Sequence, residues 1–258
     1  MVYTHGHHSS VLRSHSSRTA ANSAAYLLPH LRPEHSLLDV GCGPGTITAD
    51  FAGLVGQVTA IEQNAEALAL AEHTRDLGVR LEVADVHRLP FPDDSFDVVH
   101  AHQVLQHVTD PVQALREMRR VCKPGGLIAA RDSDYPKMAW YPEPPELDEW
   151  MSLYLRTARH NGGEPAAGRY LKTWVQRAGC SEVGVGASTW CWDSAEERAW
   201  WGGMWADRIL DSAIARQAVD YGYATPEDLA RIGQAWRDWI TAPDGWFAIL
   251  HGELLARP

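Results

Sequence analysis

The sequence predicts an α/β protein with a Rossmann-like, doubly wound sheet of seven strands, mostly parallel with the last strand antiparallel. Three observations predict it: strand-length apolar runs alternate with helical patterns, a glycine-rich turn follows the first run, and all 11 tryptophans fall in the second half. We therefore expect an N-terminal helical lid over 1–33 and a Rossmann-like core over 34–135. Residues 136–258 should add the remaining core strands and a tryptophan-rich helical cap, with inserts at about 136–165 and 194–243.

Apolar spacing and helix-capping residues predict the individual elements. Leucines and alanines at helical spacing indicate one or two amphipathic helices over residues 12–31. Asn64 and Asp110 are expected to cap helices and Gly78 to end one. The expected strands are 37–40, 57–61, 79–84, 96–101, 127–131, 182–189 and 246–255. The expected helices are 46–55, 64–77, 110–121, 147–159 and 169–178, followed by a long helical insert over 195–241.

Composition and charge exclude several classes of protein. The formal charge of −10 comes from 33 acidic and 23 basic residues, so the surface should repel RNA and DNA, and no nucleic-acid partner is expected. The four cysteines form no Cys-x-x-Cys pair, which favours reduced thiols in the cytoplasm. Because no run of 18 apolar residues occurs, no membrane partner is expected.

A glycine-rich turn stands where the first expected strand meets a helix. Its residues are Asp39, Gly41, Cys42, Gly43 and Gly45 in the order Asp-x-Gly-x-Gly-x-Gly. Residues without a Cβ let the backbone approach a ligand closely, so the turn predicts a nucleoside-type site. The spacing is not Gly-x-Gly-x-x-Gly, and no Tyr-x₃-Lys pair follows the fourth strand, which disfavours a nicotinamide oxidoreductase.

Three further motifs follow in chain order. Glu62 ends the second strand about 20 residues after the turn, a distance at which a carboxylate can accept from both hydroxyls of a ribose. The next motif, at residues 84–86, closes the third strand. The last motif begins at residue 101, at the carboxyl end of the fourth strand, where doubly wound folds place their ligand crevice. The motif residues are Glu62 and Gln63, then Ala84, Asp85 and Val86, and finally Ala101, His102, Gln103 and His107.

Together these motifs resemble class I S-adenosylmethionine-dependent methyltransferases, in the ubiquinone/menaquinone-methyltransferase-like (methyltransferase type 11) branch. The resemblance covers residues 37 to about 132 and implies S-adenosylmethionine as cofactor, with S-adenosylhomocysteine as product. It implies that the glycine turn contacts the amino-acid part of the cofactor and that Gln63 lies along the adenine. It further implies that Asp85 and Val86 bind the adenine, while Ala101, His102 and Gln103 border the sulfonium. His107 has either a cofactor role or only a packing role.

The acceptor site rests on weaker patterns. His8 and His102 are the candidate general bases, and Tyr3 is a candidate orienting hydroxyl, because the N-terminal segment of this family commonly folds over the cofactor. The crowded histidines at 5, 7 and 8 are equally consistent with a solvated terminus. Their spacing is not that of a helical His-x₃-His pair, so no metal is expected.

Aromatic side chains gather where the long helical insert begins. The clustered tryptophans are Trp190, Trp192, Trp200, Trp201 and Trp205. Aromatic walls suit a flat or cationic small acceptor. Tyr3, His8, Trp190, Trp201 and Trp205 are therefore the expected substrate contacts. The alternative is that these rings only build the core of the cap or a homodimer interface.

The sequence thus predicts a methyltransferase that acts on a small aromatic or heteroaromatic acceptor of the secondary-metabolite type, by in-line transfer from the sulfonium. Neither the methylated atom, carbon, nitrogen or oxygen, nor the oligomeric state follows from the sequence. Two alternatives stay open: a methyltransferase that acts on a macromolecule, and a non-catalytic regulatory protein that binds the cofactor.

Overall fold

The computed structural model describes residue 4 and residues 9–258. The helices are α1 (Ser9–Ser16), α2 (Ala20–Ser23), α3 (Thr46–Ala52), α4 (Ala65–Ala69), α5 (Pro111–Val121), α6 (Pro145–His160), α7 (Ala167–Arg177), α8 (Ala195–Asp211), α9 (Ala213–Asp220) and α10 (Pro226–Thr241), with 3-10 turns η1 (Leu28–His30), η2 (Glu72–Leu77) and η3 (Tyr135–Lys137). The strands are β1 (Ser36–Val40), β2 (Gln57–Glu62), β3 (Arg80–Val83), β4 (Phe96–His102), β5 (Cys122–Ser133), β6 (Ala139–Tyr141), β7 (Ser181–Trp192) and β8 (Trp246–Arg257).

The strands form one sheet in the order β3-β2-β1-β4-β5-β8-β6, and β7 also pairs with β8. The first five strands are parallel to one another, and β8 runs antiparallel to both β5 and β7. This confirms the doubly wound, mostly parallel sheet with an antiparallel last strand. The short β6 is an addition that the sequence analysis did not predict. It pairs with the first three residues of β8, a part of that strand that β5 does not pair with.

The main error in the predicted elements is the single helix expected over 64–77. Its capping residues behave as expected, because Asn64 Oδ1 accepts from the backbone N–H of Ala67 at 2.9 Å and Gly78 has a φ of 82°. Between them the chain forms the five-residue α4 and then the 3-10 turn η2. Thr74 sends its hydroxyl back to the carbonyl of Ala71 at 2.8 Å, and its N–H also bonds to that carbonyl, which tightens this segment into 3-10 turns.

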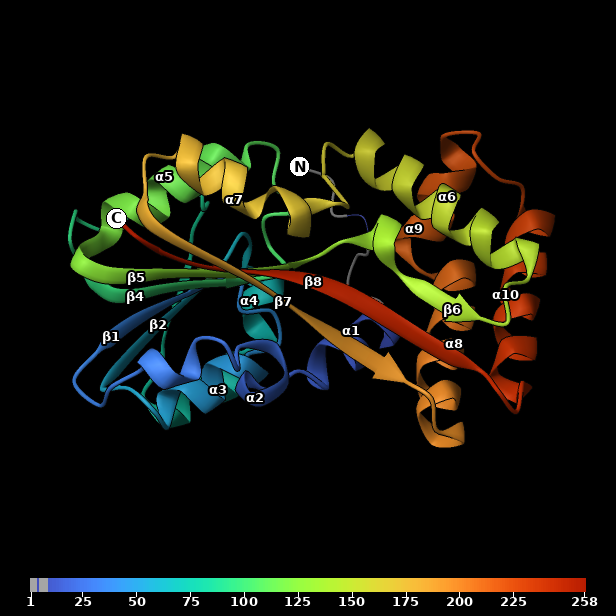
Figure 1. Ribbon diagram of the computed structural model, residues 1–258, viewed down its shortest axis with the longest axis horizontal. Helices are drawn as coiled ribbons and strands as arrows, with labels where there is room; N and C mark the ends of the chain where they lie inside the picture. The colour runs from blue at the N-terminus through green and yellow to red at the C-terminus, as the bar shows by residue number, and fades with distance from the viewer. Residues whose placement is uncertain (1–3, 5–8) are drawn as a thin grey trace.

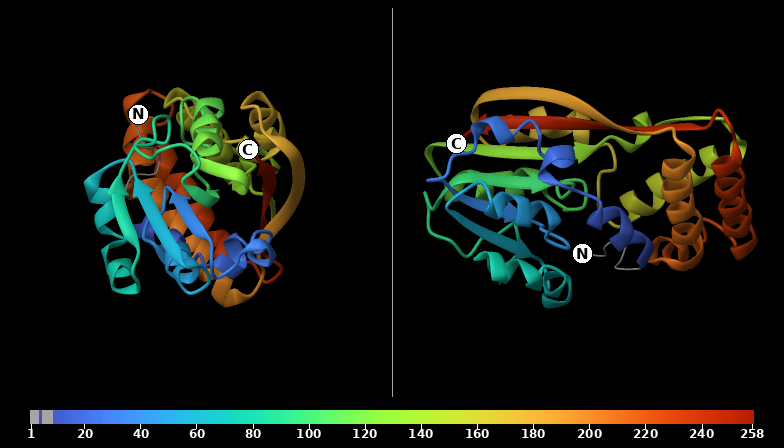
Figure 2. Two further views of the ribbon diagram at one scale, coloured as in Figure 1. Left: turned by 90° about the vertical axis from the view of Figure 1, so that its left-hand side faces the viewer. Right: turned by 90° about the horizontal axis from the view of Figure 1, so that it is seen from below.

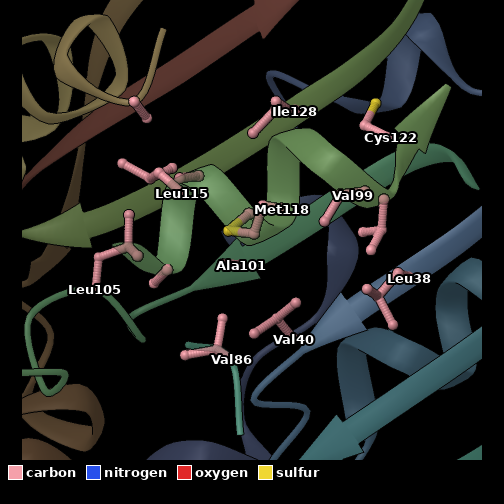
Figure 3. Close-up of a cluster of buried hydrophobic side chains, with 14 of the residues drawn as sticks. Leu38, Val40, Val86, Val99, Ala101, Leu105, Leu115, Met118, Cys122 and Ile128 are labelled. Atoms are coloured by element: carbon pink, nitrogen blue, oxygen red, sulfur yellow. The ribbon is translucent and has the colours of Figure 1, made fainter. Parts of the chain in front are cut away.

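Helices cover both faces of the sheet (Figure 1). On one face, α5 and α7 bury the side chains of a first core against β1, β4 and β5 (Figure 3). On the other face, α2, α3 and α4 bury a second core that includes Leu37, Phe51 and Ala71. This arrangement leaves the carboxyl ends of the parallel strands free to meet the rest of the chain.

The cap lies beyond the end of the core, where the long strands β7 and β8 extend toward it (Figures 1 and 2). It consists of α6, α8, α9 and α10 with its own aromatic core. Trp150 packs edge-on against Trp205 and Trp236, with ring centroids 4.6 and 5.0 Å apart. The tryptophans that distinguish the second half of the sequence therefore build this cap to a large extent.

The N-terminal segment connects core and cap. Arg208 of α8 donates to Ser14 Oγ at 2.8 Å and to the carbonyl of Ser10 at 2.9 Å, which holds α1 on the cap. At the start of α2, Ala20 N donates to Asp50 Oδ2 of α3 at 2.7 Å, which ties the same segment to the core. In the part of the chain that the structure describes, no helix has both the length and the apolar character needed to cross a bilayer.

Candidate functional site

A cavity of about 730 Å³ lies at the carboxyl ends of the parallel strands, between core and cap. Its lining comes mainly from the N-terminal segment, the turns after β1, β2, β3 and β4, the end of β7, and α8. Further lining residues come from α4, from the end of β5 and the turn after it, and from β8. Small-molecule and cofactor sites fall in this size range and at this place in open α/β sheets. The cavity is therefore the candidate site.

The glycine turn after β1 forms part of the cavity wall. Gly41, Gly43 and Gly45 all have positive φ values, of 70°, 53° and 77°. A Cβ at Gly41 would lie 2.5 Å from Val104 Cγ2, and one at Gly45 would meet Ala71 and Thr74, so these two glycines permit tight packing. A Cβ at Gly43 would meet open space. Gly43 is thus the position where an absent side chain leaves room for a ligand, whereas Gly45 does not line the cavity.

Asp39 anchors the turn rather than standing free. Its Oδ1 lies 2.8 Å from His100 Nδ1, and its Oδ2 accepts from Thr48 Oγ1 at 2.6 Å. The carboxylate is buried and links β1 to β4 and to α3. Sequence reasoning missed His100, because nothing local marks a partner 61 residues away. Asp39 does line the cavity, so the expected cofactor contact stays a prediction.

Glu62 closes the other side of the turn. Its Oε1 accepts from the backbone N–H of Gly43 at 2.8 Å, and its Oε2 accepts from that of Gln63 at 3.1 Å. The two motifs are therefore joined directly, and the carboxylate lines the cavity beside Cys42. Burial, with the nearby carboxylates of Asp39 and Glu62, raises the pKa of the Cys42 thiol, so this thiol is a neutral wall residue.

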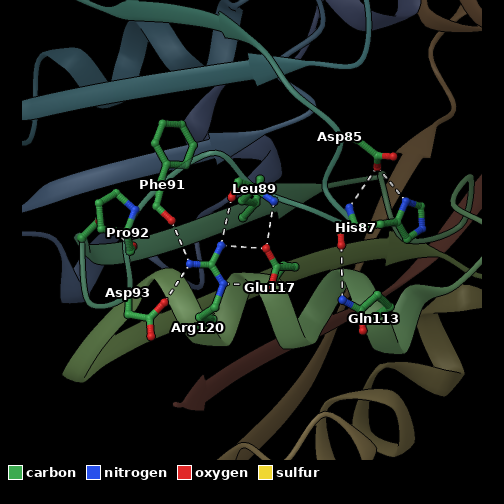
Figure 4. Close-up of polar contacts among 10 residues, drawn as sticks. Asp85, His87, Leu89, Phe91, Pro92, Asp93, Gln113, Glu117 and Arg120 are labelled. Atoms are coloured by element: carbon green, nitrogen blue, oxygen red, sulfur yellow. Dashed lines mark hydrogen bonds and ion pairs between the residues drawn. The ribbon is translucent and has the colours of Figure 1, made fainter.

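Asp85 and Val86 also line the cavity, and His87 orients the aspartate. Burial alone would raise the pKa of Asp85, but hydrogen bonds from the backbone N–H of His87 at 2.9 Å and from its ring at 2.7 Å hold that pKa below its usual range (Figure 4). Sequence reasoning missed His87. An aspartate two residues before a histidine at a strand end is the signal that could have found it.

Arg120 of α5 fixes the rest of this loop (Figure 4). Its guanidinium donates to the carbonyls of Phe91 and Leu89 at 2.8 and 2.9 Å, and to Glu117 at 2.7 Å. Glu117 in turn accepts from the backbone N–H of Leu89 at 2.8 Å. Hydrogen bonds from Arg120 hold the pKa of Glu117 below its usual range. Three of these four hydrogen bonds join the loop to α5, although its neighbour Asp85 is exposed.

The end of β4 brings polar side chains to the junction of core and cap. Gln103 has a φ of 55°, a conformation that few residues other than glycine adopt. It accepts from Arg18 Nη2 at 3.0 Å, and its Nε2 lies 3.1 Å from His251 Nε2. Gln103, His102 and His107 line the cavity, whereas Ala101 is completely buried in the core and does not. The N-terminal segment is therefore attached to the expected sulfonium region.

His102 is 5% exposed, and neither of its ring nitrogens has a hydrogen-bond partner among residue 4 and residues 9–258. Burial lowers the pKa of His102 well below its usual value, and the cations of Arg18 and Arg131 lower it further. Burial also lowers the pKa of His107 to about 3. Both imidazoles are therefore neutral at physiological pH.

Tryptophans form the wall of the cavity on the cap side. Trp190 lies 5.8 Å from the His102 ring and donates from Nε1 to the carbonyl of Asn22 at 2.8 Å. Trp192 follows at 6.3 Å from Trp190 and stacks on Trp201, with ring centroids 4.0 Å apart and planes within 8°. Together with Trp200 they line the cavity from the end of β4 to the start of α8.

The remaining expected residues fall elsewhere. Trp205 does not line the cavity but is fully buried in the cap core, because its ring packs against Trp150 of α6 and Trp236 of α10. A substrate contact by Trp205 is therefore not proposed. Tyr3 and His8 lie outside the described residues. Within the described ranges no three His, Cys, Asp or Glu side chains gather as metal ligands would.

These residues fit the cationic nucleoside that the motifs imply. Gly43 leaves open space, the Glu62 and Asp85 carboxylates provide hydrogen-bond acceptors and negative charge, and the imidazoles of His102 and His107 add no cation next to a sulfonium. The wall of Trp190 and Trp192 provides a separate surface in the same cavity. The cavity thus has a polar part that suits a nucleoside and an aromatic wall beside it.

Comparisons with known proteins show what the chain is similar to. The family model described as "Methyltransferase domain" matches residues 38–130. An uncharacterized methyltransferase of Schizosaccharomyces pombe is 33% identical over 99% of this chain and 96% of its own length. A probable methyltransferase of Aspergillus luteorubrus is 28% identical over 98% of this chain and 96% of its own. Among solved structures, the YcgJ protein of Bacillus subtilis has a TM-score of 0.58 at 22% identity, covering 92% of this chain and 99% of that one.

Proposed function

The chain belongs to the class I S-adenosylmethionine-dependent methyltransferases, and from that premise we propose that it methylates a small aromatic or heteroaromatic acceptor of the secondary-metabolite type. The observation that carries the proposal is the continuity of the cavity. One end is lined by the motifs expected to bind the cofactor, and the other by Trp190, Trp192, Trp200 and Trp201.

The motif residues would hold the cofactor in a fixed place. Glu62 would accept from the ribose hydroxyls, Asp85 would accept from the adenine amino group, and the N–H of Val86 would donate to the ring. The turn at Gly43 would face the amino-acid part. When bound, S-adenosylmethionine supplies an activated methyl group and a neutral leaving thioether. Because that chemistry needs little covalent help, alignment of the two reactants is the main contribution of the protein and can supply about 7–11 kcal/mol.

The tryptophan wall would align the acceptor. Offset or edge-to-face contacts between aromatic rings contribute about 0.5–1.5 kcal/mol beyond their buried area. Trp190 and Trp192 present such rings next to the end of β4, with their planes at 73° to each other. The N-terminal lid would cover these rings, since in its described part Asn22 accepts from Trp190 and Arg18 donates to Gln103. Water would then be excluded during transfer.

Labelled cofactor tests the proposal. Wild-type protein is incubated with S-adenosylmethionine carrying a tritiated methyl group and with panels of phenols, aromatic amines and indoles, alongside purified RNA and total protein. We expect label in a small aromatic compound and a loss of that labelling in Trp192→Ala. Trp246→Ala is the matched control, because Trp246 is exposed and does not line the cavity. Label confined to RNA or protein would contradict a small acceptor.

A further inference from the structure

We infer that His102 accepts the proton of the acceptor's nucleophilic atom, so that the methylated group is an O–H or N–H on the aromatic acceptor and not a ring carbon. This inference rests on the proposed function and specifies which kind of atom of the acceptor is methylated. His102 stands at the junction of the two halves of the cavity, at the end of β4 and next to Trp190. An acceptor that lies against Trp190 would bring a substituent to the imidazole.

The hydrogen-bonding state of His102 is the first argument. A neutral imidazole has one donor and one acceptor, and an unsatisfied buried polar group costs about 1–3 kcal/mol. Both nitrogens of His102 lack partners within the described ranges, whereas the nearby His251 faces the Gln103 amide through Nε2 at 3.1 Å. A hydroxyl or amine on a bound acceptor would provide a partner for one ring nitrogen. An acceptor that presents only an aromatic C–H would leave both ring nitrogens of His102 without a hydrogen-bond partner.

The surrounding charges are the second argument. The groups that face His102 are Arg18 from the N-terminal segment, Arg131 from β5, His251 from β8 and His100 from its own strand. Burial first, and then these charges, lower the pKa of His102 and keep it unprotonated, as a proton acceptor must be before transfer. Among the described residues, five carboxylates line the cavity, and none of them competes for this role. Asp39 is bonded to His100 and Thr48, and Glu62 and Asp85 belong to the nucleoside end. Glu196 and Glu197 lie at the exposed start of α8.

The proton and electron balance is complete. A lone pair on the acceptor's oxygen or nitrogen forms the bond to the methyl carbon, while the carbon–sulfur bond breaks and its electron pair stays on sulfur. The proton released from the O–H or N–H passes to a ring nitrogen of His102 and then to solvent. The positive charge that sulfur loses reappears on the imidazole, so the net charge of the cavity is unchanged during the step. That constancy offsets the penalty of protonating a buried histidine.

Binding of three matched probes tests the inference without knowledge of the natural acceptor. The probes are 2-naphthol, 2-naphthylamine and naphthalene, which share one ring system and differ in the hydrogen-bonding group. Their dissociation constants are measured by equilibrium dialysis in the presence of S-adenosylhomocysteine. The proteins are the wild type, His102→Phe, His102→Gln and His35→Phe. His35 is the matched control, because it also has a buried, unpartnered Nδ1 in the described structure but does not line the cavity.

We expect wild type to bind 2-naphthol or 2-naphthylamine about 10–100-fold more tightly than naphthalene. His102→Phe should reduce this preference to below about 3-fold, His102→Gln should restore part of it, and His35→Phe should keep it. Each variant should unfold cooperatively near the wild-type Tm in differential scanning calorimetry, which shows that each one folds, and S-adenosylhomocysteine is kept at a saturating concentration for each protein in the dialysis. With S-adenosylmethionine that carries a tritiated methyl group, the label should be transferred only to the oxygen or nitrogen of a probe. His102→Phe should slow this methyl transfer by about 10²–10⁴-fold.

The two ways of failing are distinct. If naphthalene binds as well as the polar probes, if His102→Phe keeps the preference, or if label enters a ring carbon, the role of His102 is refuted while the aromatic acceptor stands. If none of the three probes binds, the aromatic acceptor itself is refuted, and the inference with it. Preference for 2-naphthol over 2-naphthylamine, or the reverse, identifies the oxygen or nitrogen acceptor.

Discussion

Replacing Arg120 with methionine tests whether the loop that carries Asp85 and Val86 is held in place for the cofactor. The change removes the guanidinium that donates to the carbonyls of Phe91 and Leu89 at 2.8 and 2.9 Å, while the methionine stem keeps most of the packing on α5. Because the donor is charged, each of these bonds contributes about 1–2 kcal/mol after allowance for its partial exposure. The ion pair with Asp93 is too exposed to count.

The expected loss is therefore about 2–4 kcal/mol of unfolding free energy, which for a chain of this length lowers Tm by about 4–8 °C. If about 1–2 kcal/mol of it falls on the ordering of the loop in the folded protein, the dissociation constant of S-adenosylhomocysteine rises about 5–30-fold. Differential scanning calorimetry measures the first quantity and titration calorimetry the second.

Arg116→Met is the matched control for this variant. Arg116 is exposed on the same helix and is expected to leave both quantities unchanged. The reasoning is refuted if Arg120→Met lowers Tm as expected but binds S-adenosylhomocysteine as tightly as Arg116→Met does. That outcome would mean that the loop does not form part of the cofactor site.

Three further predictions test other parts of the account. Glu62→Gln should weaken S-adenosylhomocysteine binding about 10–100-fold in titration calorimetry and lower Tm only slightly. The amide oxygen can still accept from Gly43, and water can replace the lost bond to the exposed N–H of Gln63; unchanged affinity would exclude the ribose contact. Burial raises the pKa of Asp132 to about 7, so the folded state holds this proton between about pH 4 and 7 while the unfolded state has released it. Wild-type stability relative to Asp132→Asn should therefore fall by about 2–3 kcal/mol from pH 5 to pH 8 in urea unfolding, and a flat difference would contradict it. Trp205→Ala should cost about 3–5 kcal/mol of stability yet leave S-adenosylhomocysteine affinity unchanged, and a lost affinity would show that the cap core supports the cofactor end.

Features that depend on local chemistry were predictable from the sequence. The glycine turn is one example. Glycine adopts positive φ values readily, so a turn that needs them is visible in the sequence as Gly41, Gly43 and Gly45. The caps at Asn64 and Asp110 are another, since each side chain accepts from a backbone N–H three residues on. The alternation of strands and helices then led to the doubly wound sheet.

Features that depend on contacts between distant segments were not predictable. The link from Asp39 to His100 and the link from Arg18 to Gln103 join residues 61 and 85 positions apart, and no periodicity marks either pair. Likewise, Trp201 and Trp205 lie on the same side of one helix, one turn apart. Only the packing of α8 decides that the first lines the cavity and the second is enclosed in the cap.

The central claim is that one cavity places the cofactor against the motif residues and the acceptor against the tryptophan wall. A crystal structure of the protein with S-adenosylhomocysteine tests it most directly. We expect the ribose hydroxyls within hydrogen-bond distance of Glu62, the adenine beside Asp85, and the sulfur on the side of the nucleoside that faces His102 and Trp190. A nucleoside bound away from Glu62 and Asp85, or a sulfur turned away from Trp190, would contradict the claim.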